Sequence, residues 1–338
     1  MISPLEGGSR RRRPRRRRTV GRRLALVLAA LLPVGAVVAA WFLLSDNGGS
    51  IGAGAKAAAP GAAVTKQHAP AAALAPPGSP EAVELETPDA FQLKFKDPPR
   101  AALVFDVRSG RVLWRLRPLE PLPMASLTKL MTALLVAEKT TNRDPVLITP
   151  DALHYSGSGV GLLPKGRHVS VKALLYGLLL PSGNDAAIAL ADHVAHNQRR
   201  FVAMMNAKAH ELGLSCTHYV SPHGLEPGNR SCVADLAALS RTVLRQSRLA
   251  GIVRHAHAVV RFPIKGGKLW LNNTNPLLRA DYPGTIGLKT GDTDAAGHCL
   301  IAVVRRGGLT LGVVLLHSPN PPKQARELLA RAFRADRL

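Results

Sequence analysis

The chain contains, at residues 299–316, the sequence CLIAVVRRGGLTLGVVLL. Its two apolar runs, 299–304 and 309–316, flank a turn with two glycines, which predicts a β-hairpin. A second hairpin pattern lies far earlier, where the apolar run 101–107 is followed by a Gly-containing turn and the short run 112–114. The two hairpins together predict an antiparallel sheet that combines both ends of one folded region.

Helical patterns fill the sequence between the hairpins. The clearest are at residues 126–139, 171–180, 185–212 and 233–246. An antiparallel sheet flanked by helices, with an inserted all-helical subdomain, accounts for this order of elements. The sequence therefore predicts an α+β fold for residues 90–338.

Residues 1–44 have the composition of a membrane anchor. Residues 1–23 contain ten arginines and one glutamate, and residues 24–44 contain no charged side chain. Twenty-one residues form a helix of about 31 Å, close to the thickness of a hydrocarbon core, and arginines favour the cytoplasmic flank. We therefore predict a basic cytoplasmic tail and a single uncleaved transmembrane helix that contacts membrane lipids. A cleaved signal peptide is the competing interpretation, although the apolar stretch is longer than such peptides have.

The segment 45–89 is rich in Ala, Pro and Gly, and no aromatic residue occurs between Phe42 and Phe91. Such a composition buries too little apolar surface to offset its ordering entropy, which predicts a disordered linker. With the preceding helix as anchor, the linker would place the folded domain on the extracytoplasmic face of the cell membrane.

Ser126 stands at the start of the predicted helix 126–139, and Lys129 follows one turn later on the same face. A serine hydroxyl becomes a good nucleophile only when a base removes its proton. A lysine can be this base when burial or a second cation lowers its pKa. The N-terminus of the helix adds backbone N–H groups that can stabilise a negative oxygen. Because S-x-x-K occurs by chance about once in a chain of this length, the pattern is weak evidence alone.

Two further motifs supply matching chemistry. Ser182 and Asn184 lie in a short break after an apolar run, and Lys289-Thr290-Gly291 ends a strand-like stretch before the C-terminal hairpin. They add a second hydroxyl, an amide and a second amine at points where the chain changes direction. Together with the first motif they predict a site for nucleophilic catalysis.

With these motifs the sequence resembles the serine-type D-alanyl-D-alanine carboxypeptidases, which are low-molecular-mass penicillin-binding proteins and relatives of the serine β-lactamases. The resemblance covers about residues 99–335 and rests on S-x-x-K at 126–129, S-x-N at 182–184 and K-T-G at 289–291. Lesser matches are Ser221-Pro222-His223-Gly224-Leu225, Asn273-Thr274-Asn275 and Ala296-Gly297. The resemblance implies a β-lactamase/transpeptidase-like fold.

The resemblance also implies a reaction and its partners. The substrate would be the stem pentapeptide of peptidoglycan, cut between its two terminal D-alanines through an acyl-enzyme, and β-lactam antibiotics would bind covalently. Ser126 would be the nucleophile, Lys129 its base, and Ser182 a proton relay to the leaving amine. No cofactor and no metal are implied.

Further residues would bind the substrate. By the same resemblance, Asn184 would hold the substrate backbone, and Lys289 with Thr290 would meet the terminal carboxylate. The backbone N–H groups of Ser126 and Asp292 would form the oxyanion hole. In addition, Lys289 close to the first lysine would favour the neutral form of that amine.

One position departs from the family pattern. The family often has an arginine shortly before the final helix that helps to bind the substrate carboxylate, and Pro321 stands at that place. Lys323 and Arg326 are the candidates to replace it. Recognition of the carboxylate is therefore less well defined than the nucleophile.

Three other functions were weighed. A β-lactamase needs a carboxylate to activate water, but the spacing from Glu226 to Asn229 is one residue short of E-x-x-L-N. A scaffold that binds peptidoglycan without cutting it would not need three complete motifs. A metal-dependent peptidase could use His255-Ala256-His257, but no histidine has an aspartate seven positions later.

Cys216 and Cys232 lie on either side of residues 221–225 in a compartment predicted to be oxidising. They are predicted to form a disulfide, with two free thiols as the alternative. Cys299 lies in an apolar run and is predicted to be a packed thiol.

The chain is strongly basic, with 45 Lys and Arg against 22 Asp and Glu. Residues 90–338 alone hold 33 basic and 16 acidic side chains. Aromatic residues are not interleaved with these charges, which argues against a nucleic-acid partner. A solvated basic surface and attraction to anionic wall polymers are both consistent with the charge.

Overall fold

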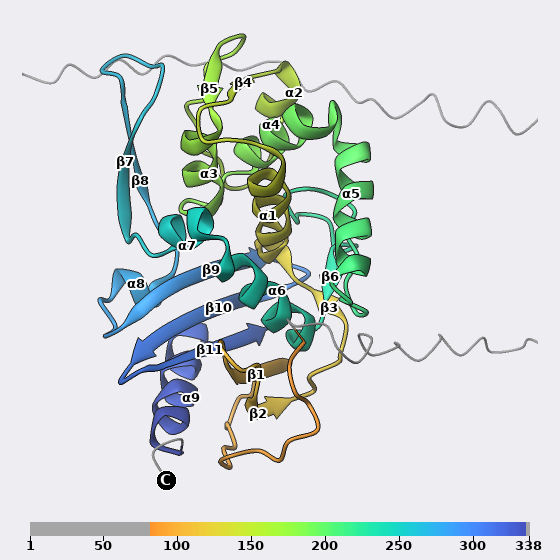
Figure 1. The fold of residues 1–338 in the computed structure, drawn as a ribbon, viewed down its shortest axis with the longest axis vertical. Coiled ribbons are helices and arrows are strands. Elements are labelled where there is room, and N and C mark those ends of the chain that lie inside the picture. The colour runs from red at the N-terminus through yellow and green to blue at the C-terminus, as the bar shows by residue number, and fades with distance from the viewer. Residues whose placement is uncertain (1–81, 336–338) are drawn as a thin grey trace, which may run out of the picture. The chain divides into compact units, whose positions relative to one another are not determined.

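The computed structural model describes residues 82–335, which belong to one compact unit (Figure 1). The predicted tail, the predicted transmembrane helix 24–44 and most of the predicted linker lie outside these residues. Within the described part, no helix is both long and apolar enough to cross a membrane.

Both predicted hairpins are present and belong to one five-stranded sheet. Its order is β2-β1-β11-β10-β9, and every neighbouring pair is antiparallel. The strands are β1 (Ala101–Asp106), β2 (Val112–Leu116), β9 (Thr285–Thr293), β10 (Gly297–Arg306) and β11 (Leu309–Leu316). Because β1 pairs with β11, the two ends of the domain meet in one sheet, as the sequence predicts.

Helices cover both faces of the sheet. Side chains alternate between the two faces along each strand, so every strand contributes side chains to both sides. On one face, Val104 packs in a cluster with Leu328 of α9 (Pro321–Ala335). On the other face, Leu103 and Val314 belong to the larger core, which the inserted helical region completes. Burial on both faces explains why these strands read as nearly continuous apolar runs.

The inserted region contains a central helix, α1, whose residues are buried on all sides from Lys129 to Val136. The helices of this region are η1 (Ala125–Thr128), α1 (Lys129–Lys139), α2 (Pro150–Leu153), α3 (Val171–Leu179), α4 (Asn184–Ala195), α5 (Gln198–Glu211), α6 (Val233–Arg245), α7 (Ser247–Val253) and α8 (Pro276–Arg279). Its strands are β3 (Leu122–Pro123), β4 (Pro145–Leu147), β5 (His168–Ser170), β6 (Arg230–Ser231), β7 (His257–Arg261) and β8 (Lys268–Asn272). Figure 1 shows α1 surrounded by α3, α4, α5 and α6.

The predicted helix 185–212 is wrong in one respect, because the structure divides it into α4 and α5. His196 adopts the left-handed conformation with φ of 66° and ends α4. The side chain of Asn197 then caps α5 by accepting a hydrogen bond from the backbone N–H of Arg200 at 2.9 Å. Apolar residues occur on both sides of this break, so their period alone did not reveal it.

The hairpin of β7 and β8 was not predicted from the sequence. Leu269 and Leu271 of β8 are buried, whereas Trp270 between them is 68% exposed. The hairpin lies beside the helical region in Figure 1. Its strands have only five residues each, and apolar residues such as Val259 and Trp270 also lie on the exposed side, so the sequence does not alternate clearly between apolar and polar residues.

The folded domain starts earlier than the predicted boundary at residue 90. Residues 82–89 were predicted to end the linker, but Val83 and Leu85 pack against the larger core. The guanidinium of Arg241 also donates a hydrogen bond to the carbonyl oxygen of Ala82 at 2.6 Å. These contacts involve few side chains, so the composition of the segment gave no sign of them.

The predicted disulfide is present between Cys216 and Cys232, whose Cα atoms are 5.6 Å apart. The bridge closes the chain around residues 221–225. Cys299 is a buried free thiol, as predicted, and burial raises its pKa to about 12.

We expect the double variant Cys216→Ala/Cys232→Ala to lower the free energy of unfolding by about 3 kcal/mol, because the bridge restricts the unfolded chain. Urea denaturation measures this loss. When the unmutated chain is denatured without reduction, alkylation should label only Cys299. Labelling of both other cysteines before reduction would contradict the assignment.

Candidate active site

Ser126 lies in the short 3₁₀ helix η1, which directly precedes α1, and Lys129 is the first residue of α1. The preceding Ala125 has φ of 48°, a conformation that costs energy for a residue with a Cβ atom and recurs at functional sites. Ser126 is partly exposed, whereas Lys129 is completely buried. A molecule from solvent can therefore reach the hydroxyl but not the amine.

The amine of Lys129 has three close oxygen neighbours. Its Nζ atom lies 2.8 Å from Oγ of Ser126, 2.6 Å from Oδ1 of Asn184 and 2.7 Å from the carbonyl oxygen of His223. An amide oxygen and a backbone carbonyl can only accept, so they occupy the two N–H groups of a neutral amine. The remaining lone pair is then available to the hydroxyl of Ser126. This arrangement suits a base that removes the serine proton.

Electrostatics also favour a neutral Lys129. Burial lowers the pKa of this amine well below its ordinary value, and the nearby Lys289 lowers it further. Asp185 and Glu226 raise the pKa by smaller amounts. The predicted influence of Lys289 therefore has the right direction, but burial is the larger cause.

Lys289 connects the other two motifs. Its Nζ atom donates hydrogen bonds to Oγ of Ser182 at 2.9 Å and to the carbonyl oxygen of Thr290 at 2.8 Å. The side chain is 1% exposed, and burial lowers its pKa to about 7. Ser182 lies between α3 and α4 with φ of 69°, a second strained position in the same site.

Strand β9 passes directly against the turn that carries the nucleophile. A Cβ atom on Gly291 would lie 2.9 Å from the carbonyl oxygen of Met124 and 3.1 Å from the backbone nitrogen of Ser126. Only glycine permits this approach. It brings the backbone next to Asp292 near the N–H of Ser126, which is the neighbourhood that the predicted oxyanion hole requires.

Asn184 is occupied at both ends of its amide. Its Oδ1 atom accepts from Lys129, and its Nδ2 atom donates to the carbonyl oxygen of Ser156 at 2.6 Å. The side chain is 1% exposed. In this structure Asn184 therefore orients the lysine, and its contact with substrate stays a prediction.

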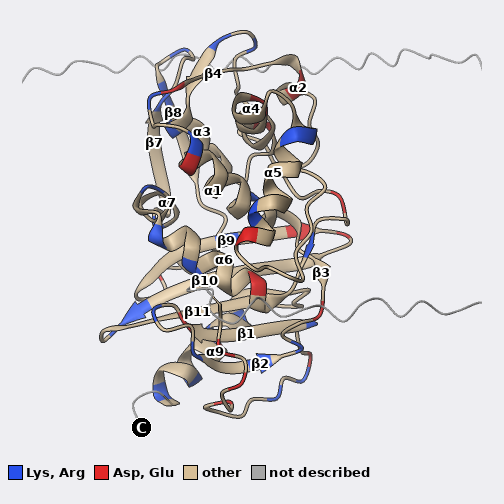
Figure 2. Cartoon of the chain, turned by 45° about the vertical axis from the view of Figure 1, so that its right-hand side comes forward, with Lys and Arg blue, Asp and Glu red and all other residues tan. Residues whose placement is uncertain are grey.

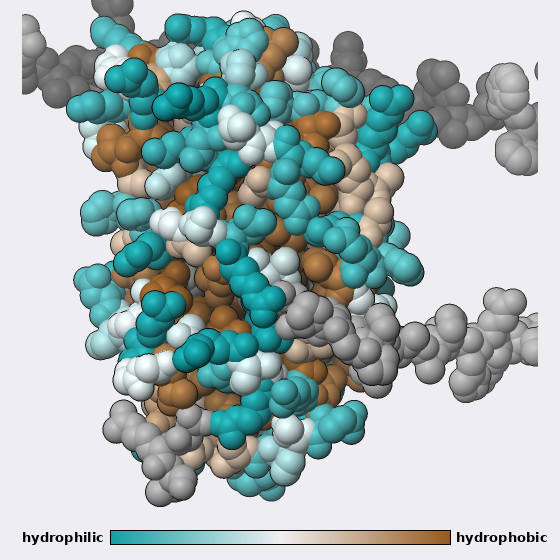
Figure 3. All heavy atoms as spheres, viewed as in Figure 1, coloured by the Kyte–Doolittle hydropathy of each residue, from teal (hydrophilic) through white to brown (hydrophobic). Residues whose placement is uncertain are grey.

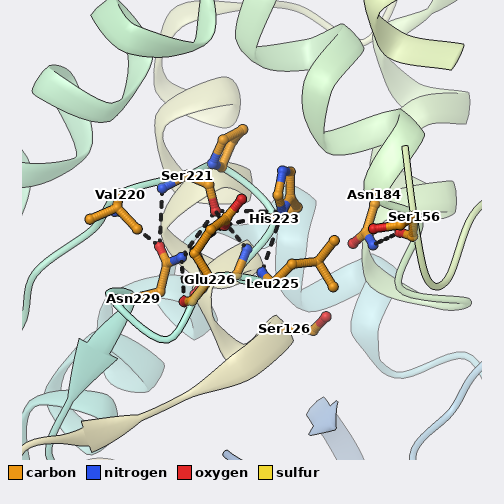
Figure 4. A network of polar contacts seen from close by, with 12 residues as sticks. Ser126, Ser156, Asn184, Val220, Ser221, His223, Leu225, Glu226 and Asn229 are labelled. Atoms are coloured by element: carbon orange, nitrogen blue, oxygen red, sulfur yellow. Dashed lines mark hydrogen bonds and ion pairs between the residues drawn. The ribbon is translucent and has the colours of Figure 1, made fainter. Parts of the chain in front are cut away.

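The loop of residues 221–229, drawn in Figure 4, carries the carbonyl group of His223 that accepts from Lys129. Within the loop, Oγ of Ser221 donates to the carboxylate of Glu226 and accepts from Nδ2 of Asn229 at 3.0 Å. Figure 4 shows Ser126 between this network and the amide of Asn184. The network fixes the loop from which the carbonyl group projects.

Glycine also allows this loop to approach the nucleophile. A Cβ atom on Gly224 would lie only 2.1 Å from the carbonyl oxygen of Ala125, and φ at this glycine is 90°. The sequence identified residues 221–225 as a lesser family match but missed their role. That role belongs to a backbone carbonyl, which side-chain patterns do not encode.

A cavity of about 360 Å³ extends from the end of β9 to the start of α9. Its lining includes Thr274, Thr290, Gly291, Asp292, His298 and Pro321. The hydroxyl oxygens of Thr274 and Thr290 are 2.6 Å apart. Pro321 thus lies where the family arginine was expected, and neither Lys323 nor Arg326 is among the described lining residues.

The histidines considered as metal ligands do not form a cluster. Among the described residues, a group of three possible ligand atoms occurs at Cys216, Cys232 and Asp235, and its two sulfur atoms are bonded to each other. His255 and His257 are both exposed and do not belong to this group.

The fold and the site define a structural class. An antiparallel sheet covered on both faces, a Ser-Lys pair at the start of the central helix and a second lysine on the adjacent edge strand are shared by serine β-lactamases and penicillin-binding proteins. A family model described as D-alanyl-D-alanine carboxypeptidase matches residues 96–320. The chain belongs to this family.

Individual relatives agree with this assignment. D-alanyl-D-alanine carboxypeptidase DacF of Bacillus subtilis is 34% identical over 243 residues, which are 69% of this chain and 62% of the relative. DacD of Escherichia coli is 35% identical over 241 residues, which are 67% of this chain and 61% of the relative. The chain therefore spans less than two thirds of the length of these relatives.

A solved structure is also similar. The crystal structure of D-alanyl-D-alanine carboxypeptidase from Mycobacterium tuberculosis has a TM-score of 0.68 and 32% sequence identity. The similarity covers 73% of this chain and 96% of that chain. The described domain accordingly has the architecture that the sequence resemblance implies.

We expect Lys289→Met to raise the melting temperature by a few degrees below pH 7. The native pKa of Lys289 is about 7 against an ordinary value of 10.5, so the unfolded chain binds this proton more tightly. Burying the amine therefore costs stability in full below pH 7, and the cost disappears as pH rises from about 7 to 10.5. Thermal unfolding as a function of pH measures the gain, which should shrink across this range.

The exposed Lys268→Met is the matched control and should leave the melting temperature unchanged at every pH. In the Lys289 variant, Ser182 loses a hydrogen-bond donor, which offsets part of the gain. A melting temperature below that of the native chain throughout would contradict the burial argument.

Proposed function

We propose that this protein is a serine-type D-alanyl-D-alanine carboxypeptidase. It hydrolyses the terminal D-Ala-D-Ala bond of peptidoglycan stem pentapeptides through a seryl acyl-enzyme. The observation that carries the proposal is the completely buried Lys129 amine. Two acceptors occupy its N–H groups, and the third neighbour is the partly exposed hydroxyl of Ser126.

Acylation follows from this geometry. Lys129 takes the proton from Ser126, and the serine oxygen forms a bond to the carbonyl carbon of the penultimate D-alanine. The negative carbonyl oxygen accepts from the N–H groups of Ser126 and Asp292. The bond to the terminal D-alanine then breaks, and the leaving nitrogen receives, by way of Ser182, the proton that Lys129 removed, so that Lys129 is neutral again. Ser182 is held for this transfer by its hydrogen bond from Lys289.

In the second half of the reaction, hydrolysis of the acyl-enzyme regenerates the free enzyme. Water attacks the acyl carbon, its proton is taken up by the basic site, and the serine oxygen leaves with a proton.

A terminal carboxylate is attracted by the positive form of Lys289, with Thr290 as hydrogen-bond partner. A β-lactam would acylate Ser126 in the same way, and its opened ring would remain on Ser126 if no group activates a water for attack on that adduct.

A β-lactamase is the second candidate function. The position of Glu226 argues against this function. Its carboxylate accepts a hydrogen bond from Ser221 and lies near Nδ2 of Asn229, within its own loop. It is thus engaged in holding that loop rather than directed at Ser126 (Figure 4). The complete motif set likewise disfavours a scaffold without activity.

We also propose that the enzyme acts at the cell membrane. The uncharged residues 24–44 would form a single transmembrane helix in contact with lipids, and the catalytic domain would lie on the extracytoplasmic side. The arginines of residues 1–23 support this orientation. Membrane fractionation of the full chain and of a variant lacking residues 1–44 tests the anchor, and a soluble full chain would refute it.

The activity is tested by incubating the full chain with a pentapeptide ending in D-Ala-D-Ala. We expect release of D-alanine, and none from a matched peptide ending in D-Ala-L-Ala. A fluorescent penicillin should label the protein once and stay bound. Sustained turnover of the penicillin would favour the β-lactamase, and absence of both labelling and D-alanine release would favour the scaffold.

A further inference from the structure

A second cavity lies at the N-terminal end of β9, away from Gly291 and Asp292 near the other end of this strand. Its volume is about 850 Å³, and it is bounded by α6, α7 and the ends of β9, β10 and β11. One lining residue, Ile286, precedes Gly291 by five positions along β9, a separation of about 17 Å at the rise of a β-strand. The cavity is therefore distinct from the candidate active site.

The charged side chains that line this cavity are all arginines. They are Arg108, Arg241, Arg245, Arg254 and Arg305. No aspartate, glutamate or lysine is among its lining residues within 82–335. Figure 2 shows basic positions on α6, on α7 and at the end of β10, gathered on the same side of the domain. This concentration of one sign of charge in a recess favours an anionic ligand.

An acidic side chain near this cavity is hydrogen-bonded within its own loop. Asp106 lines an adjoining cavity, but its Oδ1 atom accepts hydrogen bonds from the backbone N–H groups of Arg108 at 2.9 Å and Ser109 at 2.7 Å. These bonds satisfy the carboxylate locally. It reduces the positive potential of the cavity but does not occupy it.

Arg241 makes the wall of the cavity rigid. It is 3% exposed, and its guanidinium donates to the carbonyl oxygens of Val107 at 3.1 Å and Arg108 at 3.2 Å. It thereby ties α6 to the turn after β1. Arg254 and Arg305 are exposed, so their guanidinium groups are accessible for direct contact with a ligand.

The remaining lining determines the kind of anion. Leu244, Ala250 and Ile286 give the cavity apolar surface, and Ser247 and Thr310 supply hydroxyl groups. In Figure 3, apolar surface lies between hydrophilic side chains in the region of α6 and α7. A suitable ligand therefore combines carbon-rich segments with separated anionic groups. Guanidinium groups pair with two oxygens of a phosphate or of a carboxylate, and a phosphate within a chain places such a pair between carbon-rich segments.

We propose that this cavity binds a polyol chain linked by phosphodiesters. Such a chain carries one negative charge per unit, and its carbon segments can lie on the apolar surface between the arginines. The volume is sufficient for several units, as in ordinary ligand sites. A recess of this shape admits a flexible chain, whereas a flat bilayer reaches only its rim. The site is independent of the proposed hydrolysis. Binding of the anionic polymer there would keep the domain close to that polymer.

The test uses the full chain and fluorescently labelled poly(glycerol phosphate) in an anisotropy titration. We expect Arg254→Glu/Arg305→Glu to weaken binding by at least about tenfold, because two favourable charges become repulsive. The matched control is Arg199→Glu/Arg200→Glu, at two exposed positions of α5 with the same change of net charge. It should weaken binding less than about twofold. Fluorescent penicillin labelling should be unchanged in both, which shows that the fold is intact.

A second readout locates the ligand. The polymer should protect Arg254 and Arg305, but not Arg199, from modification by phenylglyoxal, as measured by peptide mass spectrometry. The N-terminal arginines are present in every variant, so their contribution cancels in the comparison. Equal losses of affinity in the two double variants, or protection confined to residues 10–23, would overturn the site.

Two further probes test the chemistry. Polyglutamate of matched length and charge should bind at least about tenfold more weakly than poly(glycerol phosphate), because its carboxylates stand on side chains of a peptide backbone that fits the recess less well than a thin chain carrying its charges in line. Vesicles containing phosphatidylglycerol present the same phosphodiester at a flat surface. Equal binding of polyglutamate, or a loss in Arg254→Glu/Arg305→Glu seen only with vesicles, would overturn the assignment to a phosphodiester chain.

Discussion

Ser126→Ala should abolish release of D-alanine from the pentapeptide and covalent labelling by penicillin. The variant removes the only hydroxyl that lies within hydrogen-bond distance of the Lys129 amine among the described contacts. Without the nucleophile no acyl-enzyme can form, and loss of such a group typically lowers the rate by about 10⁴-fold or more. The released D-alanine is measured with a coupled oxidase assay, and the adduct by intact-protein mass spectrometry.

The variant should retain its fold and its affinity for substrate, since Ser126 is partly exposed and alanine leaves little empty space. Ser215→Ala, an exposed position in the turn after α5, is the matched control and should keep full activity. Persistent D-alanine release by Ser126→Ala would assign the nucleophile to another residue. Persistent penicillin labelling would do the same, independently of the natural substrate.

Lys129→Arg should lower the rate of acylation by about 10³-fold or more, although it keeps a nitrogen-containing side chain at this position. A guanidinium remains protonated at neutral pH and has no lone pair for the proton of Ser126. It is also too large for a completely buried site filled by Asn184 and the carbonyl group of His223. The rate is measured by rapid mixing with a fluorescent penicillin.

The smaller variant Lys129→Met separates these two effects, since it removes the base but fits the space. Both variants should lose activity, whereas Lys139→Arg, at the exposed end of the same helix, should retain it. In the native chain, acylation should fall as pH decreases through the lowered pKa of Lys129, because protonation occupies the lone pair. Unchanged acylation in Lys129→Met would exclude this residue as the base.

The arrangement of the sheet followed from local patterns. The runs around residues 101–114 and 299–316 have strand character and turn residues at the right spacing, so their hairpins were predicted correctly. The division between α4 and α5 was missed because a single left-handed residue, His196, makes it. The start of the domain was placed too late, since residues 82–89 are held largely by their backbone.

For the candidate site, too, some features were predicted from the sequence and others were not. Motif spacing identified Ser126, Lys129, Ser182, Asn184 and Lys289. In the structure Lys129 is hydrogen-bonded to Ser126 and Asn184, and Lys289 is hydrogen-bonded to Ser182. Spacing did not reveal that the carbonyl group of His223 is a partner of the base. It also did not reveal that the amide of Asn184 is fully occupied, because both facts depend on segments far apart in the chain.

The sequence by itself determined the chemical groups and the family: a hydroxyl and an amine one helical turn apart, a second hydroxyl and a second amine. Only the tertiary structure decided the protonation state on which the chemistry depends. An amine at the same place on an isolated helix would be hydrated and charged. Packing of α4, β9 and the 221–229 loop around Lys129 removes the water that stabilises the charged form, so the amine becomes a base.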